Sequence, residues 1–477
     1  PVDGEVRAVA SGALANGDTV IVNADGTVSV VDGTSASQVL GSAVIFKNSS
    51  VLSEDTATTF DSASNKVVVV YRNTSNGYGT AIVGTVSGTS ISFGSPVTFE
   101  SANTESYAAT FDTSSSKVVI AYKDRGSSDY GTAVVGTVSG TAISFGSPVV
   151  FNSATTNDLS STFDSNSNKV VITYRDGSNS NYTVAKVGTV SGTSITFGSV
   201  VVYGGTSTGG PGGITFDSNS NKVVVVYQDS SNSSYGTSKV GTISGTTISF
   251  GSAAVFSNNQ LAFHISSTFD SVSNKVVIAF VSDYTNTYGR AVVGTVSGTS
   301  ISFGTPVDFD SAHTPSISFN SAANKCIIAY KDKNNSTYGT IIEGTVSGTS
   351  ISFGTAVVFE AATTTNISTV FDSNSNVVSI NYVDQGNSDK GTSVIFQSAY
   401  IETNLTSENY IGIAKGAAAD TAIATVQTGC SINDAQSGLT AGQDYYVQTD
   451  GTLGLTAADP SVLAGTAVSA TKLIVKG

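Results

Sequence analysis

The chain has 477 residues, of which 39% are hydrophobic, and a formal net charge of −14 at pH 7. This length supports at least two hydrophobic cores, and no stretch reaches the ~20 apolar residues that a membrane span requires. The acidic balance argues against nucleic acid or an anionic membrane as a partner, because both require clustered Lys and Arg. Gly, Ser, Thr, Asn and Val dominate and no long apolar pattern has a helical period, so we expect an all-β protein without membrane insertion.

The first predicted element is a β-hairpin over Gly17–Val28, with an Asp-Gly turn that Gly442–Leu453 repeats near the C-terminus. The strands that complete the second copy follow it directly, whereas those of the first copy, YIGIAKGAAADTAIATVQTG, come only after residue 400. We therefore predict one small two-fold β domain, residues 1–34 plus 401–477, into which residues 35–400 are inserted. Two separate small domains are the alternative, but an isolated hairpin is marginally stable.

Residues 35–400 contain seven copies of one pattern. A marker aromatic in a Thr-Phe-Asp-like motif recurs every 50 to 53 residues, at Phe60, Phe111, Phe163, Phe216, Phe269, Phe319 and Phe371. A period near 50 in an all-β sequence is typical of a β-propeller with four-stranded blades, whereas a β-solenoid, the alternative, usually repeats at shorter intervals. The predicted fold is therefore all-β, a seven-bladed β-propeller inserted into the small two-fold β domain.

Each copy divides into four strands, termed a to d. In the second copy we expect them at about Ala108–Phe111, Lys117–Tyr122, Thr132–Val138 and Ala142–Phe151. Asp- and Asn-rich turns join a to b, and a Ser-Gly hairpin joins c to d. Strand d must be the outer edge of a blade, because it contains prolines, which lack the donor needed inside a sheet. These are Pro96, Pro148 and Pro306.

The two ends of the repeat predict how the ring closes. The seventh copy has strands b and c, at about Val377–Tyr382 and Gly391–Gln397, but no strand d. Upstream of the first copy, Gly41–Phe46 matches the strand d segment Gly94–Phe99. We expect this N-terminal strand to supply the outer strand of the last blade, which removes the open edges of the ring.

Antiparallel strands reverse direction, so the b–c and d–a connections of all blades lie on one face of the propeller. The d–a connections differ between copies, from SANTES to GGTSTGGPGG and SNNQLAFH, whereas the a–b and c–d turns hardly change. Loops that carry specific recognition differ where scaffold turns need not. We therefore predict that this face binds a ligand, the alternative being unconstrained drift of the loops.

The b–c connections place tyrosines and aspartates on the same face. Tyrosine offers a flat apolar surface plus a hydroxyl and aspartate accepts paired hydrogen bonds, a combination suited to sugars or protein epitopes. The alternative is that the aromatics pack between blades and the acids cap the loops. The predicted ligand-binding residues are Tyr78, Tyr130, Tyr182, Tyr235, Tyr288, Tyr338, Asp124, Asp176, Asp229, Asp332, His264 and His313.

His264 and His313, the only two histidines, fall in the d–a connections of neighbouring blades. A shared metal ion would need a third ligand, for which Asp310 is the candidate, and nothing in the spacing demands one. The Asp-rich a–b turns lack the bidentate Glu of an EF-hand, so we interpret them as Asx turns, with weak calcium binding as an alternative. We predict no cofactor and no metal site, and Cys326 and Cys430 as free thiols.

Sequence motifs of enzymes are absent, including the nucleophile elbow, the zinc-protease helix, the P-loop and the dinucleotide fingerprint. A glycosidase built on a propeller would need two inward carboxylates, plus arginines if its substrate is anionic. The chain has five arginines, and Arg72, Arg125, Arg175 and Arg290 are distributed over different repeats. We therefore predict that the protein is not an enzyme, with a glycan-degrading propeller as a less favoured alternative.

The C-terminal segment SGLTAGQDYYVQTDGTLGLTAADPSVLAGTAVSATKLIVKG resembles a segment at the ends of marine bacteriophage virion proteins, often termed tail-fibre or appendage proteins. The repeat phrase YGTAVVGTVSGTAISFGSPVVF, Tyr130–Phe151, is similar to propeller repeats in the same group. The resemblance implies a structural protein of the virion whose small β domain binds other virion proteins and whose propeller is displayed. It does not decide between tail and capsid.

From this resemblance we expect the protein to attach to a host surface glycan or protein through the variable face. We also expect a homo-oligomer on the extracellular particle, since multivalency strengthens weak single-site binding. The alternative is a non-catalytic decoration of a capsid or appendage.

Overall fold

The structure is a computed structural model that describes residues 4–206, 211–282, 288–458 and 460–476. The chain divides into two compact units, which we call the small unit, residues 1–37 with 399–477, and the propeller unit, residues 38–398. The sequence-based boundaries, at 34/35 and 400/401, lie within about three residues of these positions. Among the residues that the structure describes, no helix has the length and apolar character needed to cross a bilayer.

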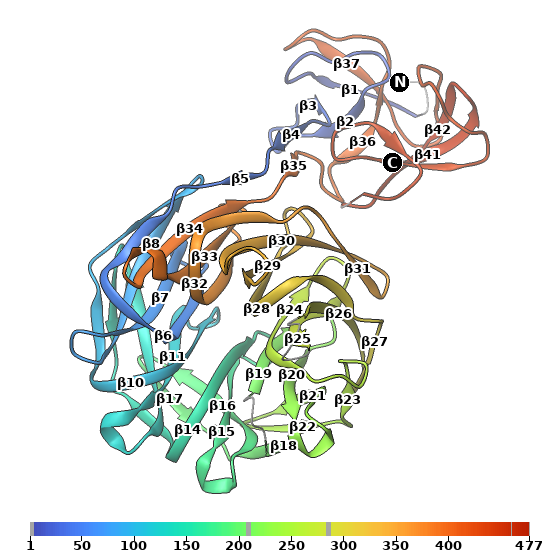
Figure 1. Ribbon diagram of the computed structural model, residues 1–477. Coiled ribbons are helices and arrows are strands. Elements are labelled where there is room, and N and C mark those ends of the chain that lie inside the picture. The colour runs from blue at the N-terminus through green and yellow to red at the C-terminus, as the bar shows by residue number, and fades with distance from the viewer. Residues whose placement is uncertain (1–3, 207–210, 283–287, 459, 477) are drawn as a thin grey trace. The chain divides into compact units, whose positions relative to one another are not determined.

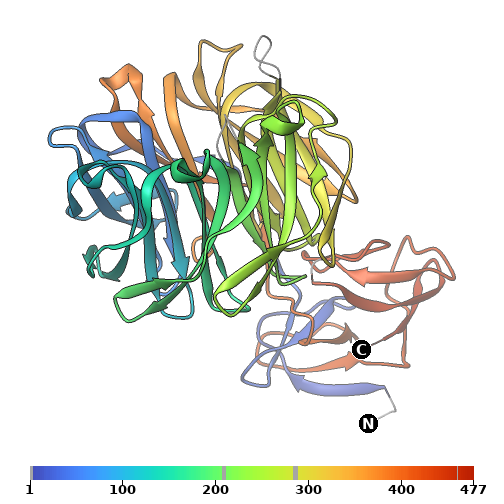
Figure 2. The same ribbon diagram turned by 90° about the horizontal axis from the view of Figure 1, so that it is seen from below.

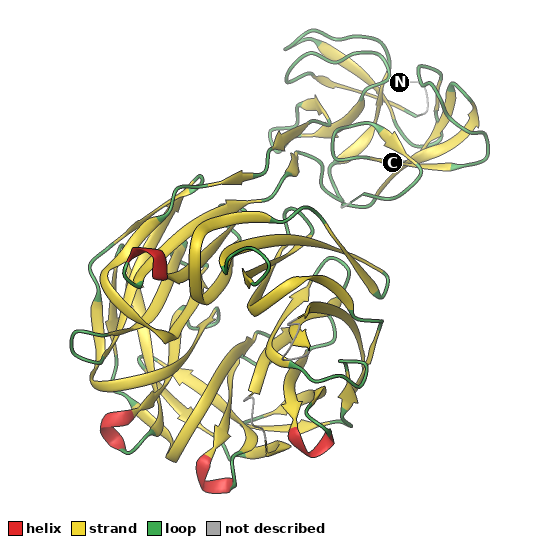
Figure 3. Ribbon diagram, viewed as in Figure 1, coloured by secondary structure: helices red, strands yellow, loops and turns green. Residues whose placement is uncertain are grey.

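The propeller unit consists of seven antiparallel sheets, the blades, arranged in a ring (Figure 1). Viewed from the side, the strands of each blade run between two faces of the ring (Figure 2). Each blade carries one marker aromatic, and the strand pairing confirms the all-β propeller fold predicted from the repeat. Figure 3 shows how strands dominate the unit, with short 3-10 helices in b–c connections.

The strands of the seven blades follow one another in chain order. Blades 1 to 3 contain β6 (Val44–Asp61), β7 (Lys66–Asn73), β8 (Tyr78–Ser87), β9 (Ser90–Phe93), β10 (Val97–Asp112), β11 (Lys117–Asp124), β12 (Tyr130–Ser139), β13 (Ala142–Phe145), β14 (Val149–Asp164), β15 (Lys169–Asp176), β16 (Tyr182–Ser191), β17 (Ser194–Phe197) and β18 (Val201–Thr206). Blades 4 and 5 contain β19 (Pro211–Asp217), β20 (Lys222–Asp229), β21 (Tyr235–Ser244), β22 (Thr247–Phe250), β23 (Ala254–Val255), β24 (Phe263–Asp270), β25 (Lys275–Ser282), β26 (Tyr288–Ser297), β27 (Ser300–Phe303) and β28 (Val307–Asn320). Blades 6 and 7 contain β29 (Lys325–Asp332), β30 (Tyr338–Ser347), β31 (Ser350–Phe353), β32 (Val357–Asp372), β33 (Val377–Asp384), β34 (Lys390–Gln397) and β5 (Val39–Leu40). The 3-10 helices are η1 (Arg125–Ser127), η2 (Gly177–Asn179), η3 (Ser230–Asn232) and η4 (Gln385–Asn387).

Most d–a connections are strands rather than the loops expected from the sequence. β10, for example, pairs with β8 as the outer strand of blade 1 and with β11 as the inner strand of blade 2. β6, β14, β28 and β32 bridge neighbouring blades in the same way. Register shifts let each strand change sheets without leaving the extended conformation. Residues 207–210, in the glycine-rich d–a segment, lie outside the described residues.

Strand d is interrupted, which corrects the prediction that prolines lie inside it. In blade 2 the outer strand consists of β13 and the start of β14, and Gly146, Ser147 and Pro148 lie between them without strand structure. Pro96 and Pro306 occupy the same interruption in their blades. The same interruption occurs where no proline is present, at residues 198–200 and 251–253, so the prolines are accommodated at a break in strand d and do not cause it.

The N-terminal strand closes the ring, as predicted. β34, strand c of blade 7, pairs with β5 through Phe396 and Leu40 and with β6 through Thr392 and Ile45. Blade 7 therefore takes its outer strand from the other end of the propeller sequence.

Neighbouring blades are joined by an aromatic pair, one ring from strand d and the other from strand b of the next blade. The ring centroids lie 5.0–5.5 Å apart in the pairs Phe46–Tyr71, Phe99–Tyr122, Phe151–Tyr174, Tyr203–Tyr227, Phe256–Phe280, Phe309–Tyr330 and Phe359–Tyr382. These edge-on and tilted contacts are favourable arrangements of aromatic rings. Phe46 and Tyr71 join the last blade to the first, so the ring has the same junction throughout.

A glycine at the break in strand d contacts the c–d hairpin of the next blade. A Cβ atom on Gly94 would lie 2.0 Å from the Thr141 carbonyl oxygen, and one on Gly41 would lie 1.9 Å from that of Thr89. Gly354 has no such neighbour, because blade 7 lacks the hairpin, and its nearest atom would be 3.9 Å away. Glycine is therefore required wherever a hairpin follows.

The small unit contains two sheets with the same strand arrangement. The first has the order β1 (Glu5–Val9), β37 (Ile423–Gln427), β36 (Tyr410–Ala414), β2 (Thr19–Val22) and β3 (Val28–Val30). The second has the order β38 (Ile432–Asn433), β42 (Lys472–Val475), β41 (Val462–Ser469), β39 (Asp444–Val447) and β40 (Leu453–Gly454). β4 (Gly33–Ala36) pairs with β35 (Tyr400–Thr403). The first sheet combines strands from before and after the propeller, and Ile21 and Ile413 share a core with Val447 and Leu473 of the second sheet.

Candidate ligand-binding site

A β-bulge at the start of strand a shapes the variable end of the propeller. Five residues before the marker aromatic, the backbone adopts positive φ values of 46–53° at Ser106, Asp158, His264, Thr314 and Asn366. The register between strands a and b shifts at each of these positions. Positive φ is uncommon for residues other than glycine and is worth notice where it recurs at one structural position.

The residue before each bulge lies opposite the end of strand b. The cross-strand partners are Glu105 with Lys123, Asn157 with Arg175, and His313 with Lys331. In blades 5 and 7 the partners are Phe263 with Val281 and Thr365 with Val383. The bulges thus bring two variable positions of strand a together with one of strand b.

These positions surround a cavity of about 530 Å³, which we call the mouth pocket. Its lining residues come from strands a and b of five blades. They are Glu105, Ser106, Lys123, Asn157, Asp158, Arg175, His264, His313, Thr314, Lys331, Thr365 and Asn366. A cavity of this size is within the range of small-molecule binding sites.

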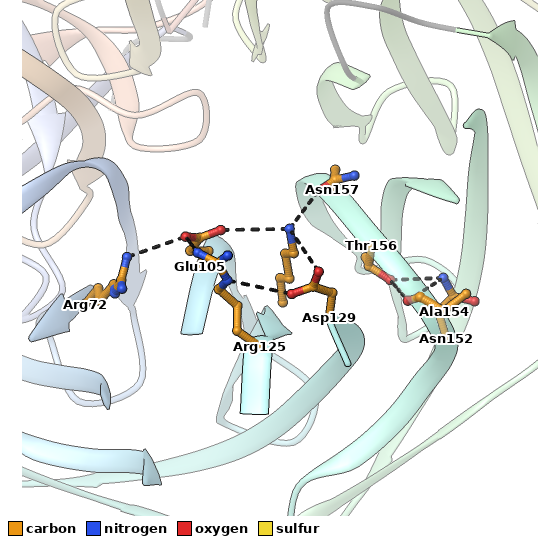
Figure 4. Close-up of polar contacts among 9 residues, drawn as sticks. Arg72, Glu105, Arg125, Asp129, Asn152, Ala154, Thr156 and Asn157 are labelled. Atoms are coloured by element: carbon orange, nitrogen blue, oxygen red, sulfur yellow. Dashed lines mark hydrogen bonds and ion pairs between the residues drawn. The ribbon is translucent and has the colours of Figure 1, made fainter. Parts of the chain in front are cut away.

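Glu105 is the centre of a charged network on one side of the mouth pocket (Figure 4). Its carboxylate forms ion pairs with Arg72 at 3.5 Å, with Lys123 at 3.8 Å and with Arg125. Asp129 adds a second acceptor, 3.9 Å from Lys123 and 3.7 Å from Arg125. The charges of Arg72, Lys123 and Arg125 are therefore balanced by carboxylates within the protein.

Asp158 and Arg175 form a second ion pair in blade 3, with 2.8 Å between Oδ2 and Nη2. Burial raises the pKa of Asp158, against the opposing effect of Arg175 and Lys123. Lys123 also donates to Asn157 Oδ1 at 3.1 Å, which joins the pairs of blades 2 and 3.

His264 and His313 meet at the opposite side of the pocket. Their Nε2 atoms lie 3.1 Å apart and their ring centroids 4.2 Å apart. Burial lowers the pKa of His264 to about 4, with smaller contributions from His313 and Lys333. Burial also lowers the pKa of His313, helped by Lys333 and Lys331. Both imidazoles are therefore neutral at pH 7, and one nitrogen donates to the other.

The predicted histidines are the only two of the twelve predicted site residues that line the mouth pocket. They lie on β24 and β28 at the bulges, not in loops as the sequence suggested. Among the described residues, no group of three or more His, Cys, Asp or Glu side chains could hold a metal ion. Asp310, the candidate third ligand, instead accepts a hydrogen bond of 2.6 Å from the Tyr330 hydroxyl.

The predicted aspartates cap their own connections. Asp124, Asp176 and Asp229 precede η1, η2 and η3 and accept hydrogen bonds from backbone N–H groups of these helices. Asp332 accepts from the N–H groups of Asn334 and Asn335. These bonds correspond to the capping role that was the alternative for these residues.

The predicted tyrosines each begin strand c and lie opposite the last residue of strand b. Tyr182 and Tyr288 are exposed, whereas Tyr78, Tyr130, Tyr235 and Tyr338 are half-buried. The aromatic side chains that join neighbouring blades are a different set.

The charged residues of the mouth pocket were missed at the sequence level. Glu105, Lys123, Asp158, Arg175 and Lys331 lie near strand ends, where single charges are common and indicate nothing by themselves. Alignment of the repeats on the marker aromatic contains a usable signal. The positions five and six residues before the marker and twelve after it change in almost every blade.

No protein family and no curated protein matches this sequence. Among solved structures, the chain is similar to a protein from Lactobacillus plantarum, with 12% identity and a TM-score of 0.46 over 64% of this chain and 84% of the other. It is also similar to Sqt1 of Chaetomium thermophilum bound to the N-terminus of a ribosomal protein, with 12% identity and a TM-score of 0.44 over 81% and 98% of the chains. The chain is also similar to a triple arginine-to-alanine mutant of AofleA from Arthrobotrys oligospora, with 10% identity and a TM-score of 0.43 over 70% of this chain and 94% of the other. At these values the likenesses carry no argument about function.

Proposed function

We propose that the protein is an attachment protein of a bacteriophage virion that binds a host surface glycan in the mouth pocket. The observation that carries the proposal is where the repeats differ. Asp follows the marker aromatic in six of the seven copies, and Lys stands six residues after the marker in six of them, with both present in five. The residues that line the pocket are instead Glu, Asn, His or Thr before the bulge and Lys or Arg on strand b.

Such a distribution is expected when one end of a repeated scaffold is adapted to a single asymmetric ligand. Most of the variable positions surround one cavity, so a single ligand can contact several of them at once. A glycan fits better than a protein epitope, because a protein partner needs about 800 Å² of contact on each side, whereas a cavity of this volume encloses a few sugar rings. Carboxylate, amide, ammonium and hydroxyl groups supply the hydrogen bonds that sugars require.

The proposal assigns the small unit to contacts with other virion proteins. The resemblance of the C-terminal segment to phage virion proteins supports this assignment. An apolar hollow on the first sheet of the unit, between Val6, Val22, Tyr410 and Ile411, also supports it, because exposed apolar patches often mark protein contacts. Location in the extracellular virion and assembly into a homo-oligomer are parts of the same proposal.

The proposal is tested by applying the full-length chain to an array of marine bacterial surface polysaccharides. We expect binding to a restricted set of glycans, retained by residues 38–398 alone. Absence of binding to every host-derived glycan, with the folded state verified by circular dichroism, would contradict attachment through glycans and favour a purely structural decoration of the particle.

Glycan cleavage is a second candidate function, favoured by two carboxylates in the lining of the mouth pocket and by the arginines beside them. Glu105 and Asp158 both line it, the pKa of Asp158 is raised as in a general acid, and Arg72 and Arg175 contact the two carboxylates. Cleavage would release reducing ends from a bound polysaccharide. Their appearance with the wild type but not with D158N would establish catalysis, and their absence on a glycan that binds would exclude it.

A further inference from the structure

The mouth pocket is asymmetric in charge. Arg72, Lys123, Arg125 and Arg175 are all within ion-pair distance of Glu105, Asp129 or Asp158. Lys331, on the far side, has no hydrogen bond or ion pair from its ammonium group to any residue in the described part of the chain. Burial, with the nearby Lys333, lowers the pKa of Lys331, which is the effect of an uncompensated cation.

The two histidines lie next to this lysine. His313 is the direct cross-strand partner of Lys331, and its Nε2 contacts that of His264 from the neighbouring blade. No carboxylate contributes to the lowered pKa values of these histidines; the charged neighbours that do are Lys331 and Lys333. Lys331, His264 and His313 form what we call the basic corner of the pocket.

A polar group of a ligand that enters this corner meets one ammonium and two imidazoles. The ammonium donates up to three hydrogen bonds, and a neutral imidazole donates one through its N–H and accepts one at its other nitrogen. A hydroxyl would leave the lysine charge uncompensated in a partly buried site, whereas an anion would neutralise it. The carboxylates that line the pocket, Glu105 and Asp158, are each paired with cations of their own and belong to other blades.

We propose that the basic corner binds an anionic substituent of the glycan, a carboxylate or a sulfate ester. This inference rests on the proposed function and specifies its substrate class as an acidic polysaccharide. The substituent takes its hydrogen bonds from the Lys331 ammonium and from an imidazole N–H, and the rest of the sugar faces Thr314, Thr365 and Asn366.

Proton linkage gives the proposal a definite pH dependence. In the free protein both histidines are neutral at pH 7, because their pKa values lie below the usual 6.5. An anion beside the rings stabilises the protonated form and so raises both pKa values. A ligand that raises a pKa binds more tightly as the pH falls toward that pKa. The charge on a sulfate ester does not change in this range, so a change in its affinity reports groups of the protein, which are the two histidines and the pocket carboxylate Asp158, whose pKa burial raises. The imidazole signals themselves separate the histidines from Asp158.

The experiment uses tag-free, full-length chain and proton NMR of the imidazole C2–H signals, of which the chain has only two. The probes are glucose 6-sulfate, glucuronate and glucose, titrated at constant ionic strength. We expect both anionic sugars to shift the two signals with saturation, at least about threefold more tightly near pH 5.5 than near pH 7.5, whereas glucose leaves them in place. The stronger of the two anionic probes identifies the substituent.

K331Q should weaken binding of the anionic probes about tenfold, the effect of losing one charge-assisted contact. K325Q is the matched control, because it makes the same charge change at the other end of the same strand, and should alter the affinity less than about twofold. Equal losses of affinity in K331Q and K325Q would overturn the proposal, and so would imidazole C2–H signals that do not shift when the anionic sugars are added.

A glycan that binds on the array equally to wild type and K331Q would leave attachment intact and remove the basic corner from it. Saturable shifts with anionic sugars, together with no array binding at all, would support an anion site while contradicting attachment to a host glycan.

Discussion

Thr314, in the wall of the mouth pocket, has a strained backbone conformation. It is β-branched and yet has a φ of 47°, a conformation that such residues rarely adopt. Asn366 occupies the same position in blade 7 with a φ of 50°, and asparagine tolerates this region more readily. A strained residue in the wall of a pocket is a common sign that the side chain is retained for function.

Replacing Thr314 with asparagine should therefore increase stability. We expect T314N to raise the free energy of unfolding by up to about 1 kcal/mol through relief of backbone strain, measured by urea denaturation. Thr365, in the same wall but with ordinary strand geometry, provides the control, and T365N should not stabilise the protein. Equal effects of the two substitutions would show that the strain at Thr314 is negligible.

The lowered pKa of His264 predicts a pH dependence of stability. The unfolded chain binds a proton at His264 near pH 6.5, whereas the folded protein binds it only near pH 4. Protonation of the unfolded state therefore removes stability progressively as the pH falls from about 6.5 to about 4. His264 remains exposed within the pocket, so solvent screening reduces the size of the effect.

H264Q isolates this contribution. The free energy of unfolding is measured for the wild type and for H264Q by denaturation at a series of pH values. The wild-type value minus the H264Q value should decrease as the pH falls from 7 to 4.5. A difference that is constant over this range would show that His264 has the same pKa in the folded and unfolded chains.

At the element scale, the outer strand of each blade is shaped by contact with the next blade. Gly41 and Gly354 occupy equivalent positions, but only Gly41 has the carbonyl of a c–d hairpin against its Cα. The pair therefore tests ring closure with an internal control.

G41A should destabilise the protein by about 1–3 kcal/mol or more, because the methyl group would lie 1.9 Å from the Thr89 carbonyl oxygen. G354A should change stability by less than about 0.5 kcal/mol, since its Cβ has open space. Thermal unfolding followed by circular dichroism measures both. Similar melting temperatures for the two variants would mean that blades 7 and 1 do not pack as described.

Sequence reasoning was most successful where the repeat itself carries the signal. The interval between marker aromatics predicts the blades, and the match of Gly41–Phe46 to strand d predicts ring closure. It was wrong about the d–a connections, because a strand that bridges two sheets has the same local composition as a loop. It was also wrong about the prolines, because an outer strand with a break that includes Pro148 has the same local composition as a continuous edge strand. The meeting of His264 and His313 depends on bulges that local sequence does not reveal.

At the scale of the whole molecule, the propeller unit contains every strand that closes its ring. The closing strand, β6, belongs to the unit, and the contacts between blades 7 and 1 lie within it. The small unit has its own core. The two units therefore have the separate cores that independent folding requires.

Residues 38–398 should fold alone with a cooperative thermal transition within a few degrees of the propeller transition of the full-length chain. Residues 56–398 lack the part of β6 that pairs with β34 but keep the part that pairs with β7, so only blade 7 loses its outer strand, and this fragment should aggregate or lose cooperativity. Size-exclusion chromatography and calorimetry measure these outcomes. A well-folded shorter fragment would show that the N-terminal strand is dispensable for the ring.

The mouth pocket, and not the tyrosine-bearing b–c connections, is the proposed place of recognition. The direct test is equilibrium binding of labelled protein to the glycan selected on the array, comparing T365W, which narrows the pocket, with Y182W, which introduces the same side chain at an exposed b–c position. We predict that T365W weakens binding at least about tenfold and that Y182W changes it less than about twofold, with both variants as stable as the wild type. Undiminished binding by T365W, or a loss confined to Y182W, would contradict the account.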